Sequence, residues 1–240
     1  VVAGDIPTLN QNTTGTAAAL TANGANCSAG SYPLGVDASG AVESCTATAS
    51  STETLTNKTL DVEATGNTIT TVSKVWLPAA ACQNATATLL WDTPTSNPAV
   101  AACITGTNTQ KGVADFADSA SLSMQQTLML PADWSGAIDA RFKWLTTATS
   151  GDVVWQLATI CVADAETDDP AFNTASVIAD TAKGTTNQTN DATITGVTTT
   201  GCAAGELMHM KVLRDSAHAS DTLAATARLI GVELTLRRAQ

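Results

Sequence analysis

Apolar and polar residues alternate with a period of two through much of the chain after Lys74. In residues 138–146 the apolar side chains fall on one face and the charged side chains on the other: Ile138, Ala140, Phe142 and Trp144 against Asp139, Arg141 and Lys143. This pattern predicts a half-buried antiparallel strand. Residues 152–162 are apolar on both faces, which predicts a central strand that is covered on both sides.

The same criteria predict further strands in residues 75–77, 86–91, 112–116, 122–130, 206–214 and 227–237. In the last of these strands Ile230, Val232, Leu234 and Leu236 are expected to point one way. No amphipathic helix of convincing length occurs; the nearest is 221–229, where a strand is an equally good interpretation. About eight strands with long loops at 92–111 and 163–190 predict an all-β fold, a jelly-roll-like antiparallel β-sandwich.

The first 72 residues differ from the rest of the chain in composition and in their pattern of apolar residues. Residues 1–25 are polar and small, so they carry too little apolar surface to fold alone and are expected to become ordered only by pairing with other chains. Residues 26–46 predict a β-hairpin, because apolar residues alternate on both sides of an Asp–Gly turn. Residues 47–72 are a Thr- and Ser-rich connector. We therefore predict an extended stem in residues 1–72 and a β-sandwich head in residues 73–240.

Charge and hydropathy exclude two classes of partner. Charged residues make up only 14% of the chain, and the net charge is −11. A phosphate-binding face needs clustered Lys and Arg, and the only tight basic pair is Arg237–Arg238, so we expect no nucleic-acid partner. No run approaches the ~18 apolar residues of a membrane span, so no membrane insertion is expected. The chain begins without Met or a signal pattern, and we expect a fragment or a processed product.

Six cysteines are present and none forms a C-x-x-C pair, which makes a zinc site an unfavoured interpretation. Because each neighbouring pair brackets one loop or hairpin, we predict the disulfides Cys27–Cys45, Cys82–Cys103 and Cys161–Cys202. The alternative is six reduced, buried thiols in a cytosolic protein. Disulfides persist outside the cytosol, so this pairing predicts an extracellular location.

Three short sequence motifs in the first 70 residues resemble segments of phage tail-fibre proteins. They are GDIPTLNQNTTGTAA (4–18), CSAGSYPLGVDASGAVESC (27–45) and STETLTNKTLD (51–61). Similar motifs occur in receptor-binding fibre-tip proteins of prophage and metagenomic origin. The resemblance implies a homotrimer on a virion surface, in which three chains wrap about one axis and the tip domain meets the receptor.

Candidate catalytic residues are few, and we assign none. His209 and His218 are the only histidines, no G-x-S-x-G elbow exists, and His209 alternates with apolar residues along a strand. Glycan cleavage would need two carboxylates at a fixed separation. The candidates are Asp115, Asp118, Asp133, Asp139 and the loop carboxylates of residues 164–169. No repeat of the β-helix kind, typical of depolymerases, is visible, so we predict that the protein is not an enzyme.

No metal or cofactor is predicted. Asp164, Glu166 and Asp168 alternate in one loop and could bind calcium, but Asp169 stands where an EF-hand requires Gly and Ala175 where it requires Glu. A solvated acidic loop is the favoured interpretation. The phosphate-binding glycine motifs are absent.

Receptor contacts are expected in the long loops at 92–111 and 163–190. Strand placement makes Trp144 and Trp155 core residues, whereas Trp134, in the turn PADWSGA, is the tryptophan expected to be exposed. The predicted contact residues are Trp134, Asp164, Glu166, Asp168 and Asp169.

The function that these observations favour is attachment of a homotrimeric tail-fibre tip to a host cell-surface glycan or protein. One alternative is a capsid decoration protein or a subunit of an extracellular filament, assembled when residues 1–25 add a strand to a neighbour. The other alternative is a glycan depolymerase.

Overall fold

A computed structural model of the protein describes residues 33–36, 42–45 and 70–239. The chain divides into two compact units, Val1–Leu60 and Asp61–Gln240. In the first unit, β1 (Pro33–Val36) and β2 (Val42–Cys45) pair antiparallel, with Pro33 opposite Cys45. This pairing confirms the strands of the predicted hairpin. The predicted disulfide Cys27–Cys45 and the rest of the stem lie outside the described residues.

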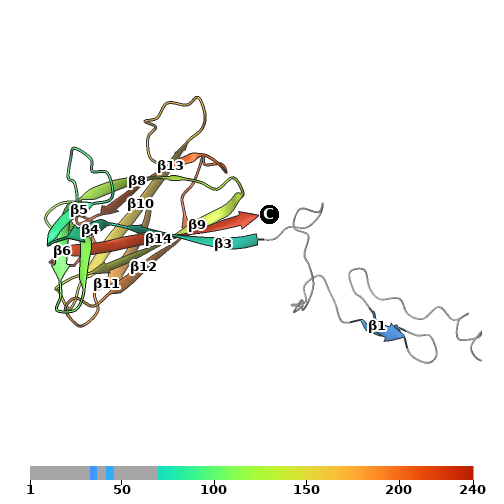
Figure 1. Cartoon of the computed structure of the whole chain (residues 1–240), viewed down its shortest axis with the longest axis horizontal. Helices are drawn as coiled ribbons and strands as arrows, with labels where there is room; N and C mark the ends of the chain where they lie inside the picture. Colours follow the sequence, from blue (N-terminus) through green and yellow to red (C-terminus); the bar gives the residue numbers. More distant parts are fainter. Residues whose placement is uncertain (1–32, 37–41, 46–69, 240) are drawn as a thin grey trace, which may run out of the picture. The chain divides into compact units, whose positions relative to one another are not determined.

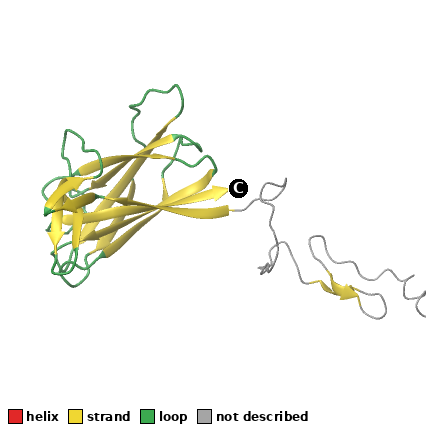
Figure 2. Ribbon diagram, viewed as in Figure 1, coloured by secondary structure: helices red, strands yellow, loops and turns green. Residues whose placement is uncertain are grey.

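The second unit is built from strands joined by loops, with no helix in residues 70–239 (Figures 1 and 2). In chain order its strands are β3 (Thr70–Pro78), β4 (Ala80–Gln83), β5 (Thr86–Leu89), β6 (Val100–Thr105), β7 (Gln110–Phe116), β8 (Ser123–Met129), β9 (Trp134–Leu145), β10 (Asp152–Val162), β11 (Ser176–Thr181), β12 (Asn190–Val197), β13 (Leu207–Arg214) and β14 (Ala227–Ala239).

The strands form two antiparallel sheets that face each other as a β-sandwich. The four-stranded sheet has the order β11-β10-β13-β8, and the larger sheet has the order β12-β9-β14-β7-β6. Strand β14 pairs with β9 along one edge; along its other edge it pairs first with β7 and then with β3. Strands β4 and β5 form a separate hairpin. The all-β, jelly-roll-like sandwich predicted from alternation is thus confirmed.

Four aromatic rings join the two sheets at the centre of the core. Trp155 on β10 stacks on Phe142 with ring centroids 5.6 Å apart. Its ring also meets Phe116 edge-on at 5.1 Å and Trp144 at 6.4 Å. All four side chains are fully buried, which confirms the predicted core positions of Trp144 and Trp155. Offset and edge-to-face ring pairs stabilise a core beyond their buried area.

Both predicted long loops contain strands. Residues 92–111 include all of β6 and the first residues of β7, and residues 163–190 include β11. Strands β4 and β12 were also missed. Short strands rich in Ala, Cys, Thr and Asp carry a weak apolar alternation, and their pairing with distant partners decides that they are extended. The loop predictions were therefore wrong in part.

The prediction that Ile230 shares a face of β14 with Val232, Leu234 and Leu236 was wrong. The pairing of β14 with β9 shifts register between Leu229 and Gly231, and this irregularity offsets the alternation by one residue. Leu229 and Val232 are buried in the core, whereas Ile230 is only half-buried and lies outside it.

Replacing Gly231 with alanine is expected to lower the free energy of unfolding by about 1–3 kcal/mol. A Cβ at this position would lie 2.6 Å from the Leu77 carbonyl oxygen and 2.6 Å from Cζ2 of Trp76, so the backbone of β3 would have to move. Chemical denaturation measures the change. Gly184→Ala is the control, because a Cβ there meets nothing within 4 Å. Equal stability of the two variants would contradict the close approach of β3 to β14.

Two disulfides tie the sandwich together. Cys82 on β4 is bonded to Cys103 on β6, and Cys161 at the end of β10 is bonded to Cys202 in the loop before β13. Two of the three predicted pairs are thus confirmed. Such bonds are typical of extracellular or secreted proteins. Among the residues that the structure describes, no helix has the length and hydropathy needed to span a membrane.

Candidate functional site

The outer face of the four-stranded sheet is set by the strict alternation of β13. Met208, Met210 and Val212 are buried in the core, and the intervening side chains point outward. Strand pairing brings the outward side chains of three strands into two rows, Ile160–His209–Thr127 and Ala158–Lys211–Gln125. This face therefore presents an imidazole, an ammonium group, an amide and a hydroxyl on rigid strands.

The loop of residues 163–175, between β10 and β11, lies against this face; a contact within the loop closes its start, and contacts to residues outside the loop hold its end. At its start the Ala163 N–H donates to the Glu166 carboxylate at 2.9 Å. Near its end the Asn173 N–H donates to the Thr159 carbonyl oxygen at 3.0 Å, and the Asn173 amide donates to the Thr200 carbonyl oxygen at 2.8 Å. The loop thus forms a supported wall beside the outer face.

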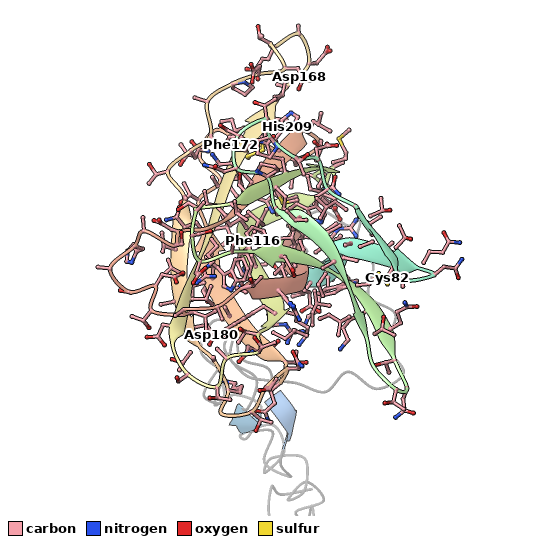
Figure 3. All side chains as sticks on the ribbon, turned by 90° about the vertical axis from the view of Figure 1, so that its left-hand side faces the viewer. Cys82, Phe116, Asp168, Phe172, Asp180 and His209 are labelled. Carbon is pink, nitrogen blue, oxygen red and sulfur yellow. A yellow bond between two sulfur atoms is a disulfide. The ribbon has the colours of Figure 1, made fainter. Side chains whose placement is uncertain are left out.

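Two basic residues of β13 contact the middle of this loop. His209 Nε2 lies 2.9 Å from Asp168 Oδ1, and His209 Nδ1 lies 3.1 Å from Thr127 Oγ1. Lys211 Nζ lies 5.1 Å from the centre of the Phe172 ring, within the range of a cation–π contact. Figure 3 shows Asp168, His209 and Phe172 gathered at one end of the sandwich.

Two cavities open between the loop and the sheet, and the Phe172 side chain lines both. The first, which we call the acidic cavity, has a volume of about 340 Å³ and is lined by Asp92, Gln125, Gln126, Thr127, Ile160, Asp168, Asp169, Pro170, Phe172 and His209. The second, the lysine cavity, has a volume of about 230 Å³ and is lined by Gln156, Ala158, Phe172, Asn173, Ala175, Lys211 and Leu213. We call the two cavities together the outer-face groove; Phe172 is the residue that they share.

The structure separates the predicted contact residues into two sets. Asp168 and Asp169 line the acidic cavity. Asp164 and Glu166 are exposed in the same loop but line neither cavity, and Glu166 instead closes the start of the loop.

The predicted exposure of Trp134 was wrong. The turn before it runs directly into β9, so Trp134 is the first residue of a strand in the larger sheet, opposite Arg238. Its ring is half-buried and packs against the core. The exposed tryptophan is Trp76, on β3, with 43% of its surface accessible.

Most of the other groove residues were not singled out from sequence. His209 was placed on a strand face, but its partners Thr127 and Asp168 come from segments 82 and 41 residues away. The one local signal was the alternation of β13, which puts His209 and Lys211 on one face. Phe172 lies in a loop and gave no periodic signal.

The carboxylates considered for glycan cleavage are dispersed. Asp115, Asp133 and Asp139 form ion pairs with arginines of β14, at 3.4 Å, 2.7 Å and 2.9 Å. Asp118 is exposed in the loop between β7 and β8. Burial raises the pKa of Asp115, and the nearby positive charge of Arg228 offsets only part of this effect. Asp115 does not line the groove.

Asp180 is a further aspartate with a perturbed pKa, and it too lies away from the groove. Burial raises its pKa, and the Trp144 indole N–H, which donates to it at 2.7 Å, acts in the opposite direction. Figure 3 places Asp180 toward the other end of the sandwich from Asp168. Within residues 70–239, no group of three or more His, Cys, Asp or Glu side chains is arranged to hold a metal ion.

No protein-family model matches the chain, and no curated protein sequence matches it. Among solved structures the chain is similar to CBM35 from Cellvibrio japonicus Abf62, with 12% identity, a TM-score of 0.37, and coverage of 68% of this chain and 92% of that one. It is also similar to the family 11 carbohydrate-binding module from Clostridium thermocellum, with 8% identity, a TM-score of 0.35, and coverage of 73% and 92%.

A third similar structure is the enzymatically active domain of tailspike protein 4 of bacteriophage CBA120. The identity is 7% and the TM-score is 0.31. The match covers 71% of this chain but only 19% of the tailspike chain.

Proposed function

We propose that this protein is a glycan-binding attachment module and that the outer-face groove is its binding surface. The observation that carries the proposal is the position of Phe172, which lines two cavities that each also hold charged and amide side chains. The electron-rich face of an aromatic ring attracts the polarised C–H groups of a sugar, and carboxylates and amides bond its hydroxyls. Binding sites commonly combine such a ring with a few convergent polar groups.

The rigidity of the groove supports binding. Its floor consists of strands β8, β10 and β13, and its wall is held by the contacts of His209 and Lys211. A site that is already shaped before the ligand arrives loses less conformational entropy on binding.

We propose that the module acts on a virion surface as the tip of a trimeric fibre. The support is the resemblance of residues 4–18, 27–45 and 51–61 to tail-fibre segments. Three copies engaging one cell surface could raise the apparent affinity by ~10²–10⁴ without any new contact. Light scattering on the full chain tests the assembly: a mass of three chains is expected, whereas an open polymer would favour the filament subunit.

We propose binding without cleavage. The carboxylates with raised pKa, Asp115 and Asp180, lie outside the groove, and of the three carboxylates that line the acidic cavity Asp168 is already in contact with His209. Incubation with host surface polysaccharide, followed by size-exclusion chromatography of the polymer, is expected to leave the chain length unchanged. Shortened chains would make the protein a depolymerase.

Replacing Phe172 with alanine is expected to weaken glycan binding about 10-fold or more, because the ring that the two cavities share is lost. The measurement is a microarray of bacterial surface polysaccharides, followed by titration calorimetry with the strongest ligand. Trp76→Ala is the matched control, since Trp76 is an exposed aromatic residue on the other sheet. Thermal unfolding of both variants verifies that the fold is kept.

Two outcomes would contradict the proposed site. Either the Phe172→Ala protein keeps the affinity of the original protein, or the Trp76→Ala protein loses as much affinity as the Phe172→Ala protein.

A further inference from the structure

We infer that the outer-face groove recognises an acidic glycan in which a carboxylated sugar lies next to an uncharged one. The inference rests on the proposed function and names its substrate class. It follows from the unequal charge of the two cavities that share Phe172.

The acidic cavity disfavours an anionic sugar. Three carboxylates, those of Asp92, Asp168 and Asp169, line it, against one imidazole. The His209 ring already contacts Asp168, so even a protonated ring leaves the cavity with an excess of negative charge. A like charge brought into a partly enclosed site is repelled. This cavity therefore suits a sugar that offers only hydroxyl and amide groups to the carboxylates and to Gln125.

The lysine cavity has the opposite character. Lys211 is the one charged side chain among its lining residues. Lys74 and Lys143 form ion pairs with Glu233 and Asp191, whereas within residues 70–239 Lys211 has no carboxylate within 4 Å. Its ammonium group rests against the Phe172 ring, which leaves its hydrogen-bond donors available. An ammonium group in this state is suited to a ligand carboxylate.

The spacing of the two cavities fits neighbouring sugars. His209 and Lys211 are two residues apart on β13, so they stand about 7 Å apart along the sheet. A distance of that order is comparable with the step from one sugar to the next in a glycan chain. Phe172 lines both cavities, so its ring can contact the sugar in each of them.

The Gln156 amide fixes one edge of the lysine cavity. It donates to the Asp215 carboxylate at 2.9 Å, and Ser121 donates to the same carboxylate at 3.4 Å. Asp215 itself is not among the residues that line the cavity. The Asp215 carboxylate is therefore already engaged by two donors and does not line the cavity with Lys211.

The test uses bacterial capsular polysaccharides that contain uronic acid, each printed in its native form and after chemical reduction of its carboxyl groups to alcohols. Polyuronates, in which every sugar is carboxylated, and neutral polysaccharides complete the panel. We expect the protein to bind a native polymer of alternating acidic and uncharged sugars at least 10-fold more tightly than its reduced form. Polyuronates are expected to bind more weakly than the alternating polymer.

Three variants assign the preference to the two cavities. Lys211→Gln is expected to lower affinity for the native polymer about 10-fold and to leave that for the reduced polymer unchanged. Asp169→Asn is expected to raise the affinity for polyuronates. Lys143→Gln is the matched control, because this lysine lies on β9 in the other sheet and pairs with Asp191. It is expected to leave the affinities for the native and the reduced polymer unchanged.

The outcomes separate this inference from the function on which it rests. If native and reduced polymers bind equally, or if Lys211→Gln weakens both to the same degree, the charge assignment is overturned while glycan binding stands. If no polymer of the panel binds, charged or neutral, glycan binding itself is overturned and the inference with it.

Discussion

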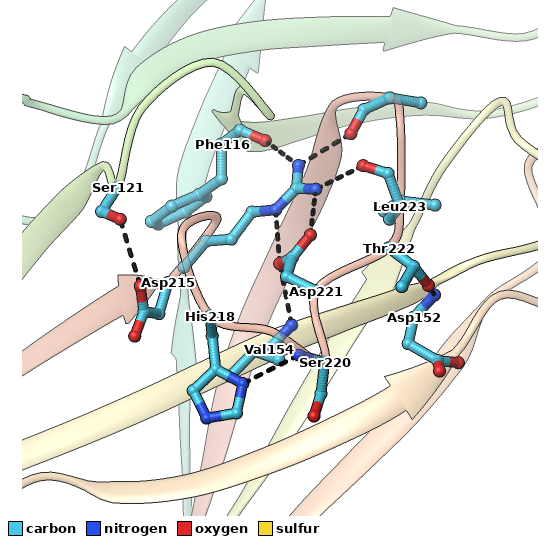
Figure 4. Close-up of polar contacts among 12 residues, drawn as sticks. Phe116, Ser121, Asp152, Val154, Asp215, His218, Ser220, Asp221, Thr222 and Leu223 are labelled. Atoms are coloured by element: carbon cyan, nitrogen blue, oxygen red, sulfur yellow. Dashed lines mark hydrogen bonds and ion pairs between the residues drawn. The ribbon is translucent and has the colours of Figure 1, made fainter.

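Replacing Asp221 with alanine is expected to lower the free energy of unfolding by about 3–5 kcal/mol, because it leaves a buried guanidinium group without its counter-charge. The Arg214 and Asp221 side chains are 0% and 2% exposed. Arg214 Nε and Nη2 donate to the two Asp221 oxygens at 3.0 Å and 2.8 Å, and the Val154 N–H donates to the same carboxylate at 3.0 Å. The contacts of Asp221 with its surroundings are drawn in Figure 4.

The backbone completes the coordination of this arginine. Its remaining donors bond the carbonyl oxygens of Phe116, Ala225 and Leu223 at 3.0 Å, 2.7 Å and 2.6 Å. All five guanidinium donors are thus satisfied. The cluster links β7, β10 and the loop before β14, so the loss of Asp221 affects both sheets.

Equilibrium unfolding in guanidinium chloride measures the effect of Asp221→Ala. The control is Asp191→Ala, which removes the exposed ion pair with Lys143 at 2.6 Å and is expected to cost less than about 1 kcal/mol. The double variant Arg214→Met and Asp221→Leu is expected to recover only part of the lost stability: no buried charge remains, but the carbonyl oxygens of Phe116, Ala225 and Leu223 and the Val154 N–H lose their partners. A cost of Asp221→Ala similar to that of Asp191→Ala would show that the cluster is open to water.

Replacing Trp155 with alanine is expected to cost about 3–5 kcal/mol of unfolding free energy, because it removes the ring that joins the two sheets and leaves a cavity. The side chain is fully buried and meets Phe116, Phe142 and Trp144 at 5.1 Å, 5.6 Å and 6.4 Å. Trp155 lies on β10, whose outward residues Gln156 and Ile160 line the groove. A weakened core is therefore expected to disturb the groove floor as well.

Thermal and chemical unfolding, followed by near-ultraviolet circular dichroism, measure this change. Trp76→Ala is again the control, because this residue is 43% exposed and its truncation is expected to leave no enclosed cavity. A difference of less than about 1 kcal/mol between the Trp155 and Trp76 variants would be incompatible with the central position of Trp155 in the core.

The sequence determined the class of the fold and several of its strongest strands. Alternation placed β9 and β13, because period-two burial depends only on the direction of successive side chains along one strand. A run that is apolar on both faces placed β10. The burial of Trp144 and Trp155 followed from the same patterns. The pairs Cys82–Cys103 and Cys161–Cys202 followed from spacing, since neighbouring cysteines around a hairpin or loop are the easiest to join.

The tertiary structure decided which strands lie side by side, and with them the candidate site. The groove exists because β13 lies between β8 and β10, so residues far apart in the chain, such as Thr127 and His209, share one face. Asp168 was a candidate from its acidic loop, but only packing of that loop on the sheet gives it a partner and makes Phe172 line both cavities. Strand order, register irregularities and loop docking arise from contacts distant in sequence, and no local pattern of residues encodes them.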